Sequence, residues 1–200
     1  MHIEQANLVF EVREIEKAKH QFVLGNVLEV DFQQWGHFDI VLCLGLLYHV
    51  SKPMVLMERV CQVNSDVLVI DTQLSGASGS YLELRHENLD DPRHAVDCEL
   101  VMVPTKQAVV DMARQLGYAA VVLKPGFQDW TGCEDYELGT RRAFLCAKKT
   151  DISDLPVEAE SIGPSPTRAG GMHTAVRLAG VLVRCVGKLL RKYPPPLKKH

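Results

Sequence analysis

The strongest constraint on the fold is a pair of buried-strand patterns separated by a helical pattern. Residues 38–44 are almost continuously apolar after one aspartate, which is typical of a strand covered by helices on both faces. Residues 67–70 repeat this pattern, and the segment between them places Leu56, Val60 and Val63 at helical spacing. A strand, a helix and a second strand form a βαβ unit with parallel strands. The sequence therefore predicts an α/β fold around a mostly parallel sheet.

The second half of the chain adds a helix and a terminal pair of strands. Thr105 is a typical N-cap residue, and the helix that it starts should end at Gly117. Residues 120–123 and 142–147 are apolar and favour strands. We expect 142–147 to run antiparallel beside 120–123.

Three further segments flank this pattern. Residues 3–19 carry apolar side chains on one side at helical spacing and predict a surface helix. Residues 22–24 predict a short strand that runs into a turn. Residues 73–104 form a long polar insertion, which at such a place more often acts as a functional lid than as a spare loop.

The C-terminal part differs from the body in composition. Residues 150–172 are rich in Pro, Ser, Gly and Glu and predict a flexible linker. Residues 173–193 predict a basic amphipathic helix, and residues 194–200 form a Pro/Lys tail. We therefore expect a globular body over residues 1–149 and an appended helix.

Charge is divided in the same way. Residues 161–200 hold eight Lys or Arg and no acid, which leaves 14 basic and 25 acidic side chains, a net charge of −11, in residues 1–160. A basic appendage on an acidic body is a usual sign of an interaction segment. Residues 174–192 are thus a candidate for contact with a membrane surface or a protein, with packing on their own domain as the alternative.

Cysteine and histidine spacing gives no sign of a metal site. The six cysteines are scattered without a Cys-x-x-Cys pair, and no histidine cluster has ligand spacing, so neither zinc nor a disulfide framework is indicated. The sequence also lacks a signal-peptide pattern and a long uncharged apolar stretch. We expect a cytoplasmic protein, with peripheral membrane association as the alternative.

The strongest local motif is residues 38–50, Phe-Asp-Ile-Val-Leu-Cys-Leu-Gly-Leu-Leu-Tyr-His-Val, followed by Lys52-Pro53. It resembles the motif after strand 4 of class I S-adenosylmethionine-dependent methyltransferases, most closely the branch that includes the tRNA wobble-uridine (carboxy)methyltransferases. The resemblance continues through 67–72 and 139–144. It implies a Rossmann-like methyltransferase domain over residues 1–149, S-adenosylmethionine as cofactor, and a small molecule or an RNA base as methyl acceptor.

The resemblance places one part of the cofactor site at Gly25, Asn26 and Val27. The family usually has Gly-Asp here, and the aspartate accepts a hydrogen bond from the adenine amino group. The amide oxygen of Asn26 is also an acceptor. The alternative is a plain turn asparagine after a strand.

A second part of the implied cofactor site is the loop that contains Leu44, Gly45 and Tyr48. This loop follows the carboxyl end of a buried strand, where ligands of open α/β sheets bind. Gly45 would let the backbone approach a ligand closely. Tyr48 resembles a family tyrosine that reaches toward cofactor or substrate; the alternative is packing below the lid.

Two further residues are candidates for chemistry. His49 is a candidate catalytic base, against the commoner role of a histidine that only hydrogen-bonds within its loop. Arg142 resembles an arginine that helps to hold an anionic cofactor in the carboxymethyl-transferring relatives, and guanidinium suits carboxylate or phosphate. The alternative for Arg142 is a charge that pairs with an acidic lid.

The sequence also departs from the family pattern. The family's glycine-rich Asp/Glu-x-Gly-x-Gly loop after strand 1 is absent from the 200 residues. Gly76-Ala77-Ser78-Gly79 is no substitute, because it leads into an insertion instead of a helix. We therefore expect a partial sheet that lacks the first βαβ segment, and a weak or inactive methyltransferase. The alternative is a non-catalytic remnant that binds a partner or a membrane surface.

Overall fold

The computed structural model describes residues 2–87 and 100–158. Its central sheet consists of β1 (Phe38–Leu44), β2 (Asn64–Gln73), β5 (Ala119–Val122) and β6 (Arg141–Ala147). The strand order is β1-β2-β6-β5. β1 and β2 pair in parallel, whereas β6 runs antiparallel to both of its neighbours, so three of the four strands point the same way. The expected α/β fold, with a mostly parallel sheet and an antiparallel terminal strand, is confirmed.

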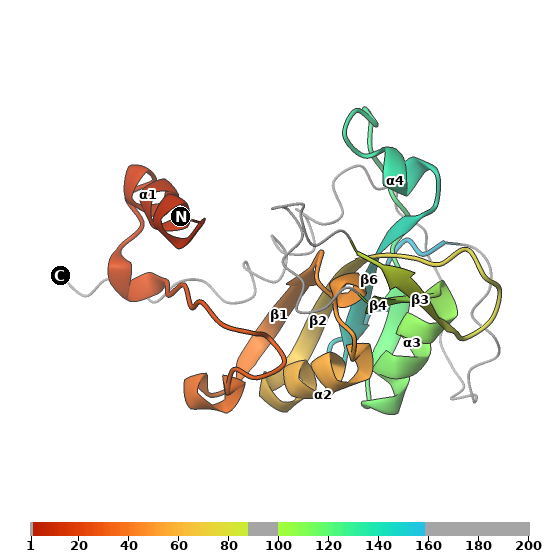
Figure 1. Ribbon diagram of the computed structural model, residues 1–200, viewed down its shortest axis with the longest axis horizontal. Helices are drawn as coiled ribbons and strands as arrows, with labels where there is room; N and C mark the ends of the chain where they lie inside the picture. The colour runs from red at the N-terminus through yellow and green to blue at the C-terminus, as the bar shows by residue number, and fades with distance from the viewer. Residues whose placement is uncertain (1, 88–99, 159–200) are drawn as a thin grey trace.

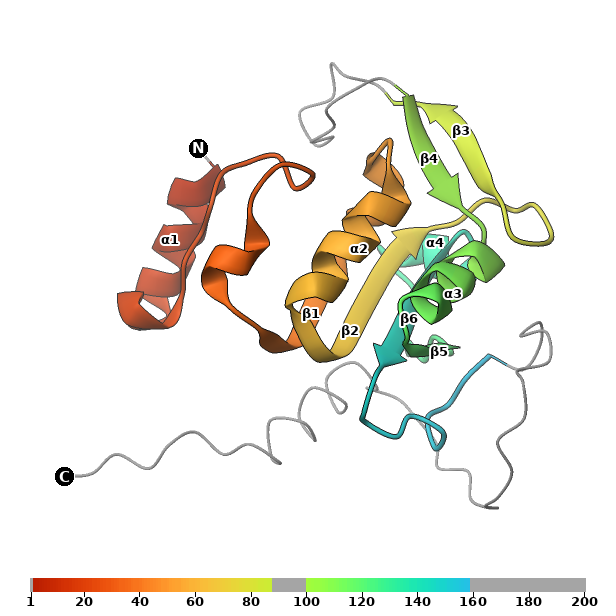
Figure 2. The same cartoon turned by 90° about the horizontal axis from the view of Figure 1, so that it is seen from below.

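One face of the sheet is covered by α2 (Pro53–Val63) and α3 (Lys106–Gln115), as Figures 1 and 2 show. The helical spacing that predicted α2 is confirmed, because Leu56, Val60 and Val63 are all buried. Together β1, α2 and β2 form the predicted βαβ unit. This unit fixes the carboxyl ends of two parallel strands side by side.

The opposite face of the sheet is covered only in part. Residues 150–158 contact it, and Ile152 is buried against side chains of β2 and β6. On β1, in contrast, Leu42 and Leu44 are 53% and 50% exposed. Within the described ranges, no strand pairs with the outer edge of β1. An open strand edge and exposed apolar side chains therefore lie together on β1.

The N-terminal part departs from the expectation. The helix predicted over 3–19 is shorter: α1 is His2–Val12, and the helical course breaks at Glu14, whose φ is +56°. A 3-10 turn, η1 (Lys17–Lys19), follows. α1 stands apart from the sheet in both views (Figures 1 and 2). The strand predicted at 22–24 is wrong, because a strand needs a hydrogen-bonded neighbour and no described segment pairs with these residues.

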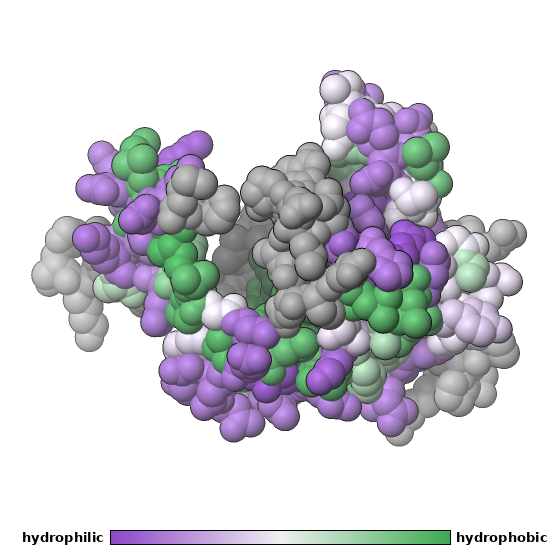
Figure 3. All heavy atoms as spheres, in the orientation of Figure 1, coloured by the Kyte–Doolittle hydropathy of each residue, from purple (hydrophilic) through white to green (hydrophobic). Residues whose placement is uncertain are grey.

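The long insertion contains a two-stranded antiparallel ribbon, β3 (Leu82–His86) and β4 (Leu100–Pro104). Its connection, residues 88–99, lies outside the described residues. The ribbon is joined to the loop after β1, because the Met102 N–H donates to the Val50 carbonyl oxygen at 3.1 Å. The apolar side chains of Leu82, Leu84 and Leu100 in this ribbon are exposed, and Figure 3 shows an apolar patch, in green, over this part of the molecule.

The C-terminal predictions fall mostly outside the described residues. Of the expected linker, only residues 150–158 are described, and they contact the sheet. The rest of the linker, the helix at 173–193 and the tail at 194–200 lie outside. None of the helices that the structure describes is long and apolar enough to cross a membrane.

Candidate functional site at the carboxyl ends of the strands

β1 ends in a tight turn beside the end of β2. Leu44, the last residue of β1, pairs with Asp71 of β2. The next residue, Gly45, has a φ of +66°, and its N–H donates to the Asp71 carbonyl oxygen at 2.9 Å. Left-handed backbone favours glycine, and a Cβ at Gly45 would lie 3.4 Å from Arg141 Nη2. Glycine therefore lets the turn pass close to this guanidinium.

The turn continues into a short 3-10 helix, η3 (Leu47–His49), which buries Tyr48. The Arg141 Cζ lies 5.9 Å from the centre of the Tyr48 ring, which is within range of a cation–π contact. Burial raises the pKa of the Tyr48 phenol, and the charge and hydrogen bond of Arg141 oppose that rise without cancelling it. The Tyr48 hydroxyl is therefore neutral at physiological pH and available as a hydrogen-bond donor.

A three-residue cluster lies beside this turn. The Arg141 guanidinium, at the start of β6, donates from Nε to Asp71 Oδ1 at 2.7 Å, and a second bond from Nη2 reaches the same oxygen. The Tyr136 hydroxyl donates to Asp71 Oδ2. The Arg141 Cζ also lies 6.0 Å from the Tyr136 ring centre. The guanidinium thus contacts two tyrosine rings while it neutralises the charge of Asp71.

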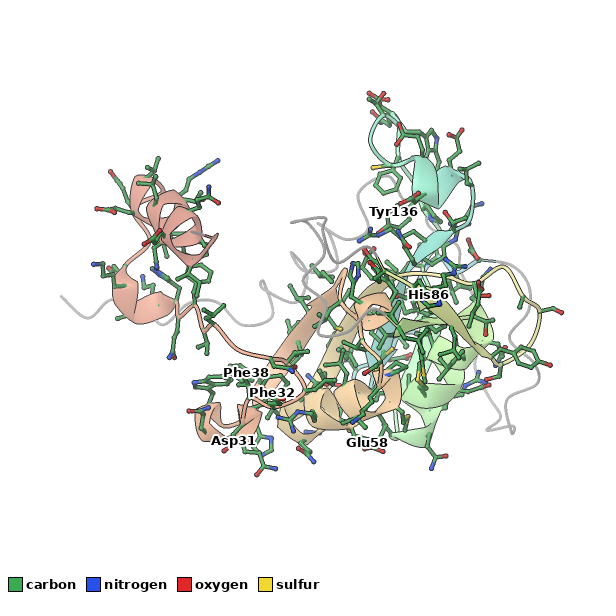
Figure 4. All side chains as sticks on the ribbon, viewed as in Figure 1. Asp31, Phe32, Phe38, Glu58, His86 and Tyr136 are labelled. Atoms are coloured by element: carbon green, nitrogen blue, oxygen red, sulfur yellow. The ribbon has the colours of Figure 1, made fainter. Side chains whose placement is uncertain are left out.

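Tyr136 belongs to α4 (Glu134–Glu137), a short helix in the segment between β5 and β6. Figure 4 shows its side chain between α4 and the strand ends. Below α4 lies a cavity of about 340 Å³, the α4 pocket. Its lining includes Leu44, Val69, Asp71, Tyr136, Arg141 and Ala143. The described residues contain no group of three or more His, Cys, Asp or Glu that could hold a metal ion.

His49 lies in the same loop but outside the lining of the α4 pocket. Its Nδ1 is 3.4 Å from Glu87 Oε1, and both side chains are 13% exposed. Glu87 follows β3 of the insertion, so the pair links the β1 loop to the expected lid. A carboxylate beside an imidazole fixes the orientation of the ring. This pairing suits a hydrogen-bonding role as well as a catalytic one.

Arg142 points away from the α4 pocket. Its Nε donates to Glu158 Oε1, and its Nη1 donates to the Tyr136 carbonyl oxygen at 2.6 Å. Glu158 is shared with Lys106, whose Nζ lies 2.6 Å from Oε2. Arg142 thus ties α4 to residue 158, and its side chain is already engaged in these contacts.

The structure does not bring Gly25, Asn26 and Val27 to the β1 loop. Asn26 Oδ1 accepts the Leu28 N–H at 2.9 Å, which closes a local turn. Gly25 and Val27 instead line a separate cavity of about 600 Å³ with Phe38, the first residue of β1. Figure 4 shows Phe38 at the end of the sheet opposite to Tyr136. A strand of this length separates the two places by about 20 Å.

Sequence reasoning missed Asp71, Tyr136 and Arg141. A polar residue at the carboxyl end of a buried strand, in Val-Leu-Val-Ile-Asp, was a signal for Asp71. No local signal marks the other two, because their contacts with Asp71 span 65 and 70 residues of sequence.

Comparisons with known proteins identify the fold. No protein-family model and no curated protein matches the chain. The crystal structure of the N-terminal domain of EvdMO1 with SAH bound is similar, with a TM-score of 0.52 and 20% identity over 72% of this chain and 58% of that chain. The same domain in the presence of SAH and D-fucose gives a TM-score of 0.53 and 20% identity, over 72% and 60%. This chain thus spans about three fifths of the length of those domains. The likeness confirms a Rossmann-like fold.

Proposed function

We propose that this chain is a class I S-adenosylmethionine-dependent methyltransferase domain by ancestry, nearest in motif to the tRNA wobble-uridine branch, and that it is weak or inactive by itself. The main support is the turn from Leu44 to Tyr48. It combines a left-handed glycine with a buried tyrosine at the carboxyl ends of two parallel strands. In open α/β sheets this is where ligands bind.

The residues present fit part of the cofactor. Leu44, Gly45 and Tyr48 would contact it, and the cofactor would supply an already activated methyl group. Methyl transfer asks the protein mainly for alignment of the reacting atoms and exclusion of water. Asn26 lies at the other end of β1, and the 200 residues contain no Gly-x-Gly run to hold the methionine portion. Each missing charge-assisted hydrogen bond costs about 1.5–3 kcal/mol, so affinity should fall by orders of magnitude.

Calorimetric titration of the chain with S-adenosylhomocysteine tests this proposal. We expect no measurable heat at micromolar ligand. In a parallel NMR titration at millimolar ligand, we expect shifts at the amides of the Leu44–Tyr48 turn. A micromolar dissociation constant would contradict the weak-binding part of the proposal. Saturating shifts that leave this turn unchanged would contradict the cofactor assignment.

A second candidate function is binding of a partner or a membrane surface. The exposed Leu42 and Leu44 favour protein contact, and the eight basic residues of 161–200 favour an anionic surface. We expect the chain to bind vesicles that contain phosphatidylserine, less so at high salt. Replacement of Arg177, Arg184, Lys188 and Arg191 by Glu should abolish this binding; unchanged binding would contradict the electrostatic role of residues 174–192.

A further inference from the structure

The α4 pocket shares Leu44 with the loop after β1, but its other lining residues come from β2, β6 and the segment that contains α4. It opens on the face of the sheet that α2 and α3 do not cover, because Val69, Asp71 and Ala143 point to that face. Val69, Ala143 and Leu44 give it an apolar base, and Cys133 and Asp135 stand on its α4 side. A concave site with an apolar base and few polar groups is the usual form of a small-molecule site.

The wall formed by α4 is fixed by side chains on both sides. The Tyr136 hydroxyl donates to Asp71, and Arg142 donates to the Tyr136 carbonyl oxygen. Arg142 is in turn paired with Glu158. The pocket is therefore formed before a ligand arrives, which lowers the entropic cost of binding.

The charges of the lining favour one class of ligand. Arg141 is its only positive side chain among the described residues, and its charge is taken up by Asp71. Asp135 adds a second carboxylate, so the lining carries a net charge of −1. An anionic ligand that displaced Asp71 from Arg141 would break an ion pair whose side chains are 10% (Asp71) and 26% (Arg141) exposed. Breaking a pair of this kind leaves an uncompensated charge and is costly.

We propose that the α4 pocket binds a small molecule with an apolar or aromatic body and a neutral or cationic hydrogen-bond donor, and that it excludes anions. That this molecule is the methyl acceptor rests on the function proposed above. Asp135 and the second lone pair of Asp71 Oδ2 accept from its donor group, and Tyr136 contacts its body. The same charges disfavour a nucleic-acid phosphate, in keeping with the net charge of −11 over residues 1–160.

Three probes that share a phenol ring and differ in the terminal group test the proposal. They are tyramine, which is cationic, tyrosol, which is neutral, and 3-(4-hydroxyphenyl)propionate, which is anionic. In an NMR titration of the full chain without cofactor, tyramine and tyrosol should shift the amides of Leu44 and of residues 132–136. The propionate should bind at least ten times more weakly than tyramine. Equal or tighter binding of the propionate, or shifts that miss these amides, would overturn the proposal.

A pair of matched variants separates the pocket from general surface charge. Asp135→Asn should weaken tyramine binding severalfold and tyrosol binding much less, because the amide oxygen still accepts a hydrogen bond but carries no charge. Glu137→Gln removes the same charge from the same helix outside the lining, and should change neither. An equal loss in both variants would show attraction to the acidic surface only and would refute the assignment. Because no cofactor is present, failure of the cofactor experiments would leave this result unaffected.

Discussion

Arg141 and Asp71 join the first residues of β6 to the last residues of β2. Arg141 Nε lies 2.7 Å from Asp71 Oδ1, and the side chains are 26% and 10% exposed. The Asp71 backbone carbonyl also accepts from Gly45. One aspartate therefore connects the β1 turn, α4 and β6, and the site depends on its charge.

Replacement of Asp71 by Ala should destabilise the chain by about 2–3 kcal/mol, because the Arg141 charge would lose its partner in a half-buried place. The partial exposure of Arg141 keeps this below the cost for a fully buried pair. Urea unfolding followed by circular dichroism measures the change. The double variant Asp71→Leu with Arg141→Met should recover most of the loss; a double variant as unstable as Asp71→Ala would show that the charge is not the cause.

Asp66 should make the stability of the chain depend on pH below about 4. Burial acts against its ionised form, but hydrogen bonds from Thr150 and Lys149 outweigh burial and lower its pKa. A carboxyl with a lowered folded-state pKa stabilises the fold above its unfolded pKa, and this contribution is lost as pH falls through the folded value. Asp66→Asn should therefore flatten the loss of stability between pH 4 and pH 3 in urea titrations. The control variant Asp154→Asn, at an exposed site, should lose stability between pH 4 and pH 3 as steeply as the unaltered chain.

The parts of the fold that could be predicted from sequence are those with a local cause. The apolar run of β1 and the helical spacing of α2 follow from neighbours a few residues away, and both are confirmed. The strand expected at 22–24 failed because pairing is a non-local property. Val23 and Leu24 are apolar enough for a strand, yet they are 49% and 89% exposed, and no strand in residues 2–87 or 100–158 pairs with them.

In the candidate site, too, only residues with a local sequence signal could be predicted. Gly45 could be predicted, because a glycine after a buried strand signals a close turn. Sequence alone could not show whether Arg141 or Arg142 belongs to the site. Adjacent residues of a strand point to opposite faces, so only one of the two arginines can face Asp71. Only the pairing of Asp71 with Ala143 shows that Arg141, two residues before Ala143, shares the face of Asp71.

Weak cofactor binding should depend on Tyr48, in the loop after β1, and not on the turn at Asn26. In an NMR titration with millimolar S-adenosylhomocysteine, Tyr48→Phe should weaken binding about fivefold, the effect of one lost hydrogen bond of about 1 kcal/mol. Asn26→Ala should leave binding unchanged, because Asn26 lies at the far end of β1 and its Oδ1 is bonded to Leu28. An effect of Asn26→Ala as large as that of Tyr48→Phe would mean that the two loops meet in the bound state.

The open edge of β1 should make the chain self-associate. Leu42 and Leu44 are half exposed, and no described strand covers the backbone groups at this edge, so a second chain can pair with it. Sedimentation velocity should show oligomers that grow with concentration. Leu42→Lys should shift them toward monomer, because a lysine here opposes edge pairing. The control variant Leu84→Lys, at a comparably exposed leucine of the β3–β4 ribbon, should leave the oligomers unchanged. If only this variant were monomeric, the association would belong to the ribbon and not to the edge of β1.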